Sequence, residues 1–187
     1  EEMEVDGNRD VDYVITTREL SRMIRQANIS FRELEDSDFD DPMGEATGAG
    51  AIFGTTGGVM EAALRTAADT LEGKNLEKLE YTQVRGEKGI KRAELSLGGT
   101  PIKVVVASGL SNARKIMEEI KNGTADYQFV EIMACPGGCV MGGGQPIKSS
   151  KIRSAVDVRK LRADSLYSID EASTIRKSHE NPAIQKI

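Results

Sequence analysis

Apolar residues recur at helical spacing in three stretches of the chain. The helices that this spacing predicts cover residues 17–27, 59–71 and 110–121. Thr16 and Glu19, at the start of the first stretch, have the spacing of a capping box. Gly73 follows the second stretch at the position of a helix C-cap. We therefore expect three amphipathic helices with defined ends.

Other stretches have the patterns of strands. Residues 102–107 carry one lysine and are otherwise apolar, which is typical of a central parallel strand buried on both faces, and residues 129–134 form the next predicted strand. With the helix between them they make one βαβ unit, which we expect to cross over right-handed. Residues 79–84 and 93–97 alternate polar and apolar side chains, which predicts two half-exposed, antiparallel strands. Further short strands are predicted over residues 11–15 and 31–35.

The order of these elements predicts an α/β fold: a parallel-sheet lobe with flanking helices, an antiparallel strand pair and a helical C-terminal tail. The composition shifts after Pro146, and residues 148–160 are basic and short of large apolar side chains. Ser168 and Glu171 again have capping-box spacing. We divide the chain into a lobe, 1–150, and a tail, 151–187, that wraps a neighbouring surface.

Composition and charge exclude several classes of protein. The chain has 187 residues, a net charge of -5 and an estimated pI of 5.1, which argue against a nucleic-acid-binding surface. No run reaches the roughly 18 apolar residues of a membrane span, and no signal peptide is visible. We expect a soluble, cytoplasmic protein. The charged start at Glu1, without an initiator Met, indicates a piece of a longer protein.

The candidate chemistry lies in residues 131–146, EIMACPGGCVMGGGQP, directly after the last predicted strand. This stretch holds both cysteines of the chain, Cys135 and Cys139. Thiolates are the ligands that iron–sulfur clusters select, and the intervening glycines let both sulfurs converge on one cluster. The same spacing also suits buried structural thiols or a redox pair. A four-ligand cage cannot be closed by this chain, because its one histidine, His179, is expected to be an exposed helix-end residue.

Residues 131–146 resemble the third of three cysteine signature motifs of iron-only hydrogenases. Residues 10–20 and 44–66 are similar to the same family, and residues 176–182 resemble its small-subunit region. The resemblance implies a [4Fe–4S] cluster bridged to a two-iron centre that carries CO, cyanide and a dithiolate.

By the same resemblance, Cys135 matches a ligand of the cubane and Cys139 the cysteine that bridges the two centres. Met133 corresponds to a methionine packed near the two-iron centre, and Phe53 and Gly54 line the same pocket. The implied catalytic groups of this chain are Cys139 and Met133. From the residues alone, Phe53 and Met133 could equally be plain core residues.

The implied reaction is the reversible reduction of two protons to dihydrogen. The family's first two cysteine motifs do not occur in this sequence, so we expect a hydrogenase segment that is inactive alone. Its implied partners are the rest of the catalytic domain and a ferredoxin-like electron donor or acceptor, with no nucleic acid and no membrane span. Apolar surface left uncovered predicts self-association.

Other interpretations remain open. A hydrogenase-like iron–sulfur assembly protein would keep similar cysteine motifs without hydrogen chemistry. A third possibility is a binding fragment that needs no metal and folds as a plain α/β domain or pairs with itself, in which case two chains could pool four cysteines into one cluster. The glycines of 44–58 lack the Gly-Lys-Ser/Thr of a phosphate loop. Several basic residues either steer an acidic partner or form a solvated helix face, namely Lys148, Lys151, Arg153, Arg159, Lys160 and Arg162.

Overall fold

A three-stranded mixed sheet forms the centre of the computed structural model, which describes residues 4–37, 46–73, 80–86 and 88–186. The strands lie in the order β3 (Ile90–Leu97), β4 (Thr100–Ser108) and β5 (Phe129–Met133). Strand β4 pairs antiparallel with β3 and parallel with β5. The fold is therefore α/β as predicted, with the antiparallel pair and the parallel pair sharing one central strand.

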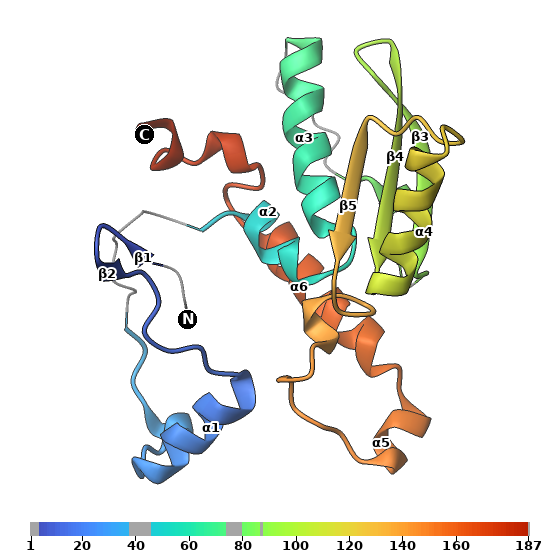
Figure 1. Cartoon of the computed structure of the whole chain (residues 1–187). Helices are drawn as coiled ribbons and strands as arrows, with labels where there is room; N and C mark the ends of the chain where they lie inside the picture. The colour runs from blue at the N-terminus through green and yellow to red at the C-terminus, as the bar shows by residue number, and fades with distance from the viewer. Residues whose placement is uncertain (1–3, 38–45, 74–79, 87, 187) are drawn as a thin grey trace.

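Two helices cover opposite faces of this sheet, α3 (Gly58–Glu72) and α4 (Leu110–Lys121) (Figure 1). Alternate residues of β4 face each helix. Val104 and Val106 pack in one buried cluster with residues of α3, whereas Val105 and Ala107 pack in a second cluster against α4. Burial on both faces explains why β4 is an almost continuous apolar run.

The long amphipathic elements agree with their predictions. Helix α1 (Thr17–Gln26) has the predicted capping box: the side chain of Thr16 accepts from the backbone nitrogen of Glu19, and the side chain of Glu19 accepts from the backbone nitrogen of Thr16. Gly73 ends α3 with a left-handed φ of +63°. Helix α4 has the bounds that its periodicity indicated.

Three short strand predictions are wrong. Residues 11–15 form no regular element, and a 3-10 turn occupies Phe31–Glu33. In the third stretch, residue 79 lies outside the described residues and Thr82–Val84 is another 3-10 turn. There Tyr81 and Val84, three positions apart, both enter the core beside β4, so the apolar spacing belongs to a turn and not to a strand.

The C-terminal part consists of α5 (Ser150–Ala155), α6 (Val158–Ala172) and two 3-10 turns, Ser178–Glu180 and Ile184–Lys186. Helix α6 begins where Asp157 accepts a bond of 3.0 Å from the backbone of Lys160. Ser168 is therefore inside a helix, and the capping box predicted there is wrong. Helix α6 packs against the short helix α2 (Gly48–Ala51) and the 3-10 turn Ile52–Gly54 that follows it.

A buried network of charges joins α6 to α3. Arg65 of α3 donates two bonds of 2.8 Å to the carboxylate of Asp170 and one of 3.0 Å to Glu61. Arg176 adds a bond of 2.7 Å to Asp170, and Arg85 binds Glu61 from the other side at 2.6 Å. The tail is thus bound to the lobe by paired charges as well as by apolar contacts.

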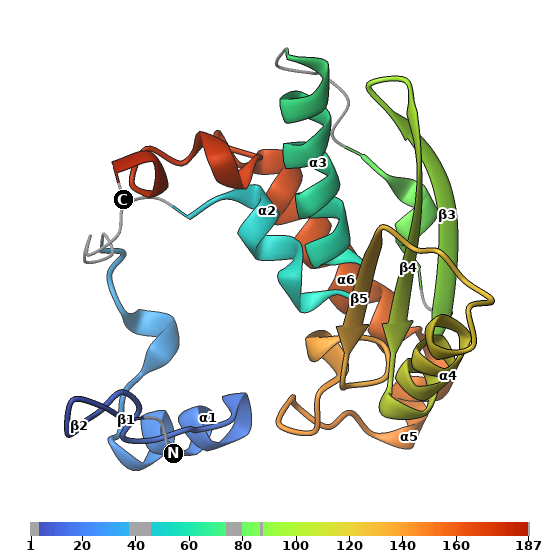
Figure 2. The same ribbon diagram turned by 45° about the horizontal axis from the view of Figure 1, so that its top comes forward.

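The N-terminal part stands away from the sheet in both ribbon views (Figure 2). It contains α1 and a small hairpin of β1 (Glu4–Val5) and β2 (Asn8–Arg9). No side chain described in this part is buried, and Tyr13 is 88% exposed. Among the helices of the described residues, none is long and apolar enough to cross a membrane.

Candidate metal centre

Both cysteines lie on the loop that leaves β5 at the edge of the sheet where the parallel strands β4 and β5 end. Ligands of open α/β sheets bind outside this carboxyl edge. The backbone of Gly138 donates to Cys135 at 3.0 Å, and that of Gly142 donates to Cys139 at 2.9 Å, so each cysteine begins a tight turn. Both thiols are free, with Cys135 half-buried and Cys139 exposed. The loop therefore presents Cys139 outward while it partly shields Cys135.

The cysteine loop packs directly on the glycine-rich segment that contains Phe53 and Gly54. Gly138 has a left-handed φ of +95°, and a Cβ placed on it would lie 2.8 Å from the carbonyl oxygen of Gly54 and 2.8 Å from the backbone nitrogen of Thr56. Only glycine permits this approach. The structure thus brings together two segments that the sequence separates by about eighty residues, with Phe53 44% exposed beside them.

Met133 is the last residue of β5 and is half-buried. Its carbonyl oxygen accepts a bond of 2.8 Å from Gly109 at the start of α4. Neither Met133 nor Phe53 belongs to the buried core. Met133 lies at the sheet edge, whereas Phe53, in the 3-10 turn Ile52–Gly54, lines a groove along α3 together with Val59 and Ala63. Their roles toward a cofactor stay predictions.

Two charged residues behind the site were not singled out from the sequence. Glu131 of β5 is buried and accepts bonds of 2.7 Å from the backbone nitrogens of Gly57 and Met60, at the start of α3. A carboxylate here satisfies two free N–H groups and the helix dipole. The only sequence signal is a single acidic residue within an otherwise apolar strand.

Lys91 of β3 reaches the same turn from the other side. Its ammonium group donates to the carbonyl oxygens of Thr56, at 2.6 Å, and Gly86, at 3.0 Å. Burial lowers the pKa of Lys91 to about 8, although the negative charge of Glu131 opposes this shift. Lys91 and Glu131 together fix the turn on which the cysteine loop rests.

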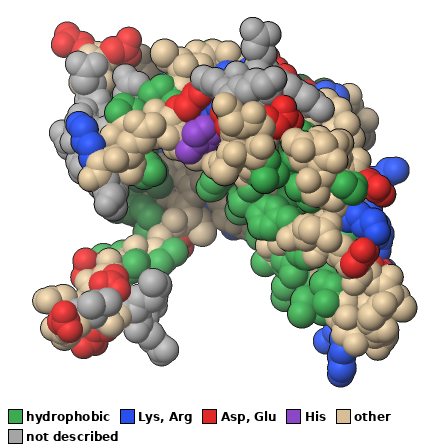
Figure 3. Space-filling model, turned by 90° about the horizontal axis from the view of Figure 1, so that it is seen from above, with side chains coloured by type: hydrophobic (Ala, Val, Ile, Leu, Met, Phe, Trp, Pro, Cys, Tyr) green, Lys and Arg blue, Asp and Glu red, His purple; other side chains and the backbone are tan. Residues whose placement is uncertain are grey.

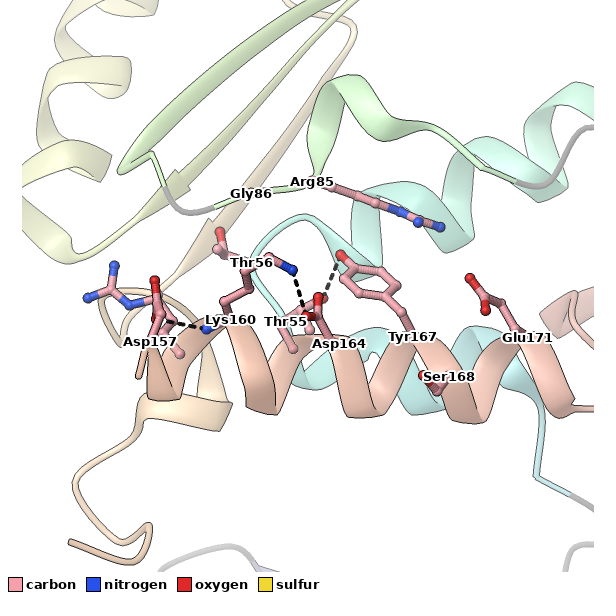
Figure 4. Close-up of a pocket in the computed structure, with 13 residues that line it drawn as sticks. Thr55, Thr56, Arg85, Gly86, Asp157, Lys160, Asp164, Tyr167, Ser168 and Glu171 are labelled. Atoms are coloured by element: carbon pink, nitrogen blue, oxygen red, sulfur yellow. Dashed lines mark hydrogen bonds and ion pairs between the residues drawn. The ribbon is translucent and has the colours of Figure 1, made fainter. Parts of the chain in front are cut away.

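A cavity of about 610 Å³ lies between α6 and this turn (Figure 4). Tyr167 of α6 shares a hydrogen bond of 3.2 Å with the hydroxyl of Thr55, and the guanidinium of Arg85 lies 4.2 Å from the centre of the tyrosine ring. Burial raises the pKa of Tyr167. Two cationic side chains that line the cavity already have carboxylate partners, since Lys160 pairs with Asp164 and Arg85 with Glu61, each at 2.6 Å.

Another cluster contains His179, which is half-buried and not exposed as predicted (Figure 3). Its Nε2 lies 3.1 Å from Asp69, and its Nδ1 bonds to Thr66 at 3.0 Å. Asp69, His179 and Glu180 form the one group of potential metal ligands with three or more members among the described residues. The ammonium of Lys177 already lies 2.7 Å from Asp69, so the cluster is an ion-pair contact between tail and α3.

The cysteine loop fits half of a four-thiolate cluster site. Its two sulfurs are soft ligands on a glycine-rich turn, as an iron–sulfur cluster requires. No third His, Cys, Asp or Glu of the described residues joins them in a metal-binding group. The remaining ligands of such a cluster would have to come from another polypeptide segment.

Family models match most of the chain. Residues 1–143 match the model of the C-terminal domain of the iron-only hydrogenase large subunit, and residues 156–187 match that of the iron hydrogenase small subunit. Iron hydrogenase 1 of Clostridium pasteurianum is 54% identical over 186 residues, which are 100% of this chain and 32% of that protein. A periplasmic [Fe] hydrogenase large subunit of Nitratidesulfovibrio vulgaris is 49% identical over 78% of this chain and 35% of its own length.

Two further comparisons bear on the alternatives. Protein NAR1 of Arabidopsis thaliana is 37% identical over 73% of this chain and 30% of its own length. The solved structure of a variant of [FeFe]-hydrogenase HydA1 from Chlamydomonas reinhardtii has a TM-score of 0.71 and 40% identity, over 97% of this chain and 52% of that chain. The chain therefore spans about a third of the length of the curated relatives that it matches.

Proposed function

This chain belongs to the iron-only hydrogenase family, as a part of the C-terminal domain of the large subunit followed by a small-subunit region, and we propose that it supplies two of the cysteine ligands of the active-site cluster. The observation that carries the proposal is the position of Cys135 and Cys139 on one glycine-rich loop at the carboxyl edge of the sheet. In this proposal Cys135 would be a ligand of a [4Fe–4S] cubane, and Cys139 would be the ligand shared with a two-iron centre that carries CO, cyanide and a dithiolate.

The bound cluster would supply the reversible reduction of two protons to dihydrogen, and the residues of this chain would hold and shield it. Exposure of Cys139 lets its sulfur reach a group outside the chain, while the half-buried Cys135 anchors the inner side. Phe53 and Met133, both only partly covered by this chain, would exclude water from the cluster. We include Cys139 and Met133 as the catalytic contacts of this segment.

The hydrogenase proposal is favoured over an iron–sulfur assembly factor by two findings. The hydrogenase of C. pasteurianum matches at higher identity than protein NAR1 and over the whole chain instead of 73% of it. The small-subunit region is also present, and its helix α6 packs on the glycine-rich segment of the candidate site. Infrared bands of metal-bound CO and cyanide in the assembled protein would separate the two functions.

Further parts of the proposal concern partners and location. The rest of the catalytic domain would supply the ligands that this chain lacks, and a ferredoxin-like protein would exchange electrons with the enzyme. We propose a division at residue 150 between the lobe and the small-subunit-like tail, and a cytoplasmic location. The chain alone should be inactive, because it carries only two cysteines.

Iron and acid-labile sulfide analysis under anaerobic conditions tests the proposal. The chain would be measured alone and after assembly with the remainder of a hydrogenase catalytic domain, as wild type, Cys135→Ser and Cys139→Ser. We expect almost no iron in the chain alone, a full cluster in the wild-type assembly, and loss of iron in both variants. Hydrogen evolution by the chain alone, or assembled variants with unchanged iron, would refute it.

A further inference from the structure

One face of α6 follows the candidate site from end to end. Arg159, Arg162, Leu166 and Asp170 lie three or four positions apart and therefore share one side of the helix. A Cβ placed on Gly137 would lie 3.0 Å from the Arg159 side chain, so this arginine covers the middle of the cysteine loop. Leu166 and Asp170 continue the same contact surface.

Leu166 and Asp170 contact the segment that leads into the pocket. A Cβ placed on Gly54 would lie 2.7 Å from the side chain of Leu166. A Cβ placed on Gly48 would lie even closer to the carboxylate of Asp170. The face is therefore continuous from the cysteine loop to α2. The two basic residues on this face, Arg159 and Arg162, are half-buried, whereas Arg153 on α5 is exposed.

Arg162 makes the most specific contacts of this face. Its Nη1 donates to the carbonyl oxygen of Val140 at 2.9 Å, and its Nη2 donates to that of Pro146 at 2.6 Å. Val140 directly follows Cys139 and is buried, and Pro146 lies two residues after the glycine run. One planar guanidinium thus ties together the two ends of the loop after Cys139, which a flexible ammonium group cannot do with the same geometry.

We propose that Arg162 is the positioning residue for Cys139, so that the small-subunit region forms a working part of the cluster site. This inference rests on the proposed ligand role of Cys139. By fixing the carbonyl of Val140, Arg162 restricts the backbone that carries the neighbouring sulfur.

The first test uses the 187-residue chain without a cluster and therefore does not depend on metal binding. Three loop amides are hydrogen-bonded within the loop, those of Met141, Gly142 and Gln145. Arg162→Gln should accelerate hydrogen exchange of these amides by about tenfold, since the loop then opens locally. Arg162→Lys should give an intermediate rate. The matched control is Arg153→Gln, which removes an equal charge from an exposed site.

The second test uses the assembled hydrogenase with its cluster and reads the infrared bands of CO and cyanide together with iron content. Arg162→Gln should shift the bands or reduce the iron bound, Arg162→Lys should partly restore both, and Arg153→Gln should match the wild type. Loop exchange and infrared bands that equal those of the wild type in both Arg162 variants would overturn the inference. Absence of iron in the wild-type assembly would instead refute the proposed function, while the exchange result would still decide the role of Arg162 in ordering the loop.

Discussion

Asp170→Asn tests how strongly the tail is bound to the lobe. The carboxylate of Asp170 is fully buried and accepts two bonds from Arg65 and one from Arg176. Asparagine has almost the same shape, but only one side-chain oxygen accepts, and its NH₂ group would face the guanidinium donors. Arg65 would retain Glu61 as a charged partner at 3.0 Å.

The expected loss follows from these contacts. Breaking a buried ion pair by removing one partner typically costs about 3–5 kcal/mol, and the remaining Glu61 places this variant near the lower end, at roughly 3 kcal/mol. Asp164→Asn is the matched control, because it removes the same charge from the same helix. Asp164 pairs with Lys160 at the exposed surface, where such a pair contributes only about 0.3–0.5 kcal/mol.

Urea unfolding followed by far-UV circular dichroism measures both variants, since the chain has no tryptophan for fluorescence. Burial alone would raise the pKa of Asp170, but the bonds from Arg65 and Arg176 hold it below its ordinary value. The ionised carboxylate therefore stabilises the fold at pH values above about 4 and ceases to do so as the pH falls through the folded-state pKa. The difference between wild type and Asp170→Asn should shrink in acid. Equal stabilities of Asp170→Asn and Asp164→Asn at pH 7 would refute the reasoning.

Three further predictions concern the loop, the buried lysine and the exposed N-terminal part. Gly138→Ala should lower the free energy of unfolding by roughly 2–4 kcal/mol in chemical denaturation, because residue 138 has a left-handed φ and the new Cβ would meet backbone atoms. The control Gly143→Ala should be nearly neutral, because there is open space around Gly143. The pKa of Lys91 is lowered from 10.5 to about 8, so the unfolded chain binds more protons than the folded one between these pH values. The free energy of unfolding of the wild type should therefore rise with pH over that range relative to that of Lys91→Met. Parallel pH profiles of the two proteins would contradict this. Tyr13→Ser combined with Phe31→Ser should weaken self-association of the chain in sedimentation velocity, because both rings are exposed; a monomeric wild type at every concentration would exclude the effect.

The elements that could be predicted from sequence are those whose own pattern decides their structure. Strand β4 is apolar because both faces are buried, and α3 and α4 each carry one apolar side, so periodicity was sufficient. The short segments failed because neighbours decide their conformation. Residues 31–35 have strand-like composition, but β1 pairs only with β2 and the second sheet ends at β3 and β5 within the described part of the chain.

The candidate site shows the same division. Cys135 and Cys139 could be singled out as candidates from the sequence because their spacing and the glycines around them are local features. The supporting charges could not be found, since Glu131 acts on the start of α3 more than seventy residues away, and Arg162 acts on the loop from α6. A basic side chain on a solvated helix face and one that bonds to loop carbonyls have the same sequence signature. Only the packing of α6 distinguishes them.

Arg65 makes the lobe and the small-subunit region depend on each other for stability. This residue is 1% exposed within α3, and two of its acceptors, the carboxylate of Asp170 and the carbonyl oxygen of Arg176, come from the tail. Removing the tail would leave the guanidinium with Glu61, which is shared with Arg85. It would also uncover Gly54 and free the loop carbonyls that Arg162 binds. A lobe without this region would therefore lose both the charge balance in its interior and the support for its cysteine loop, so we regard the tail as part of the structure that shapes the candidate site.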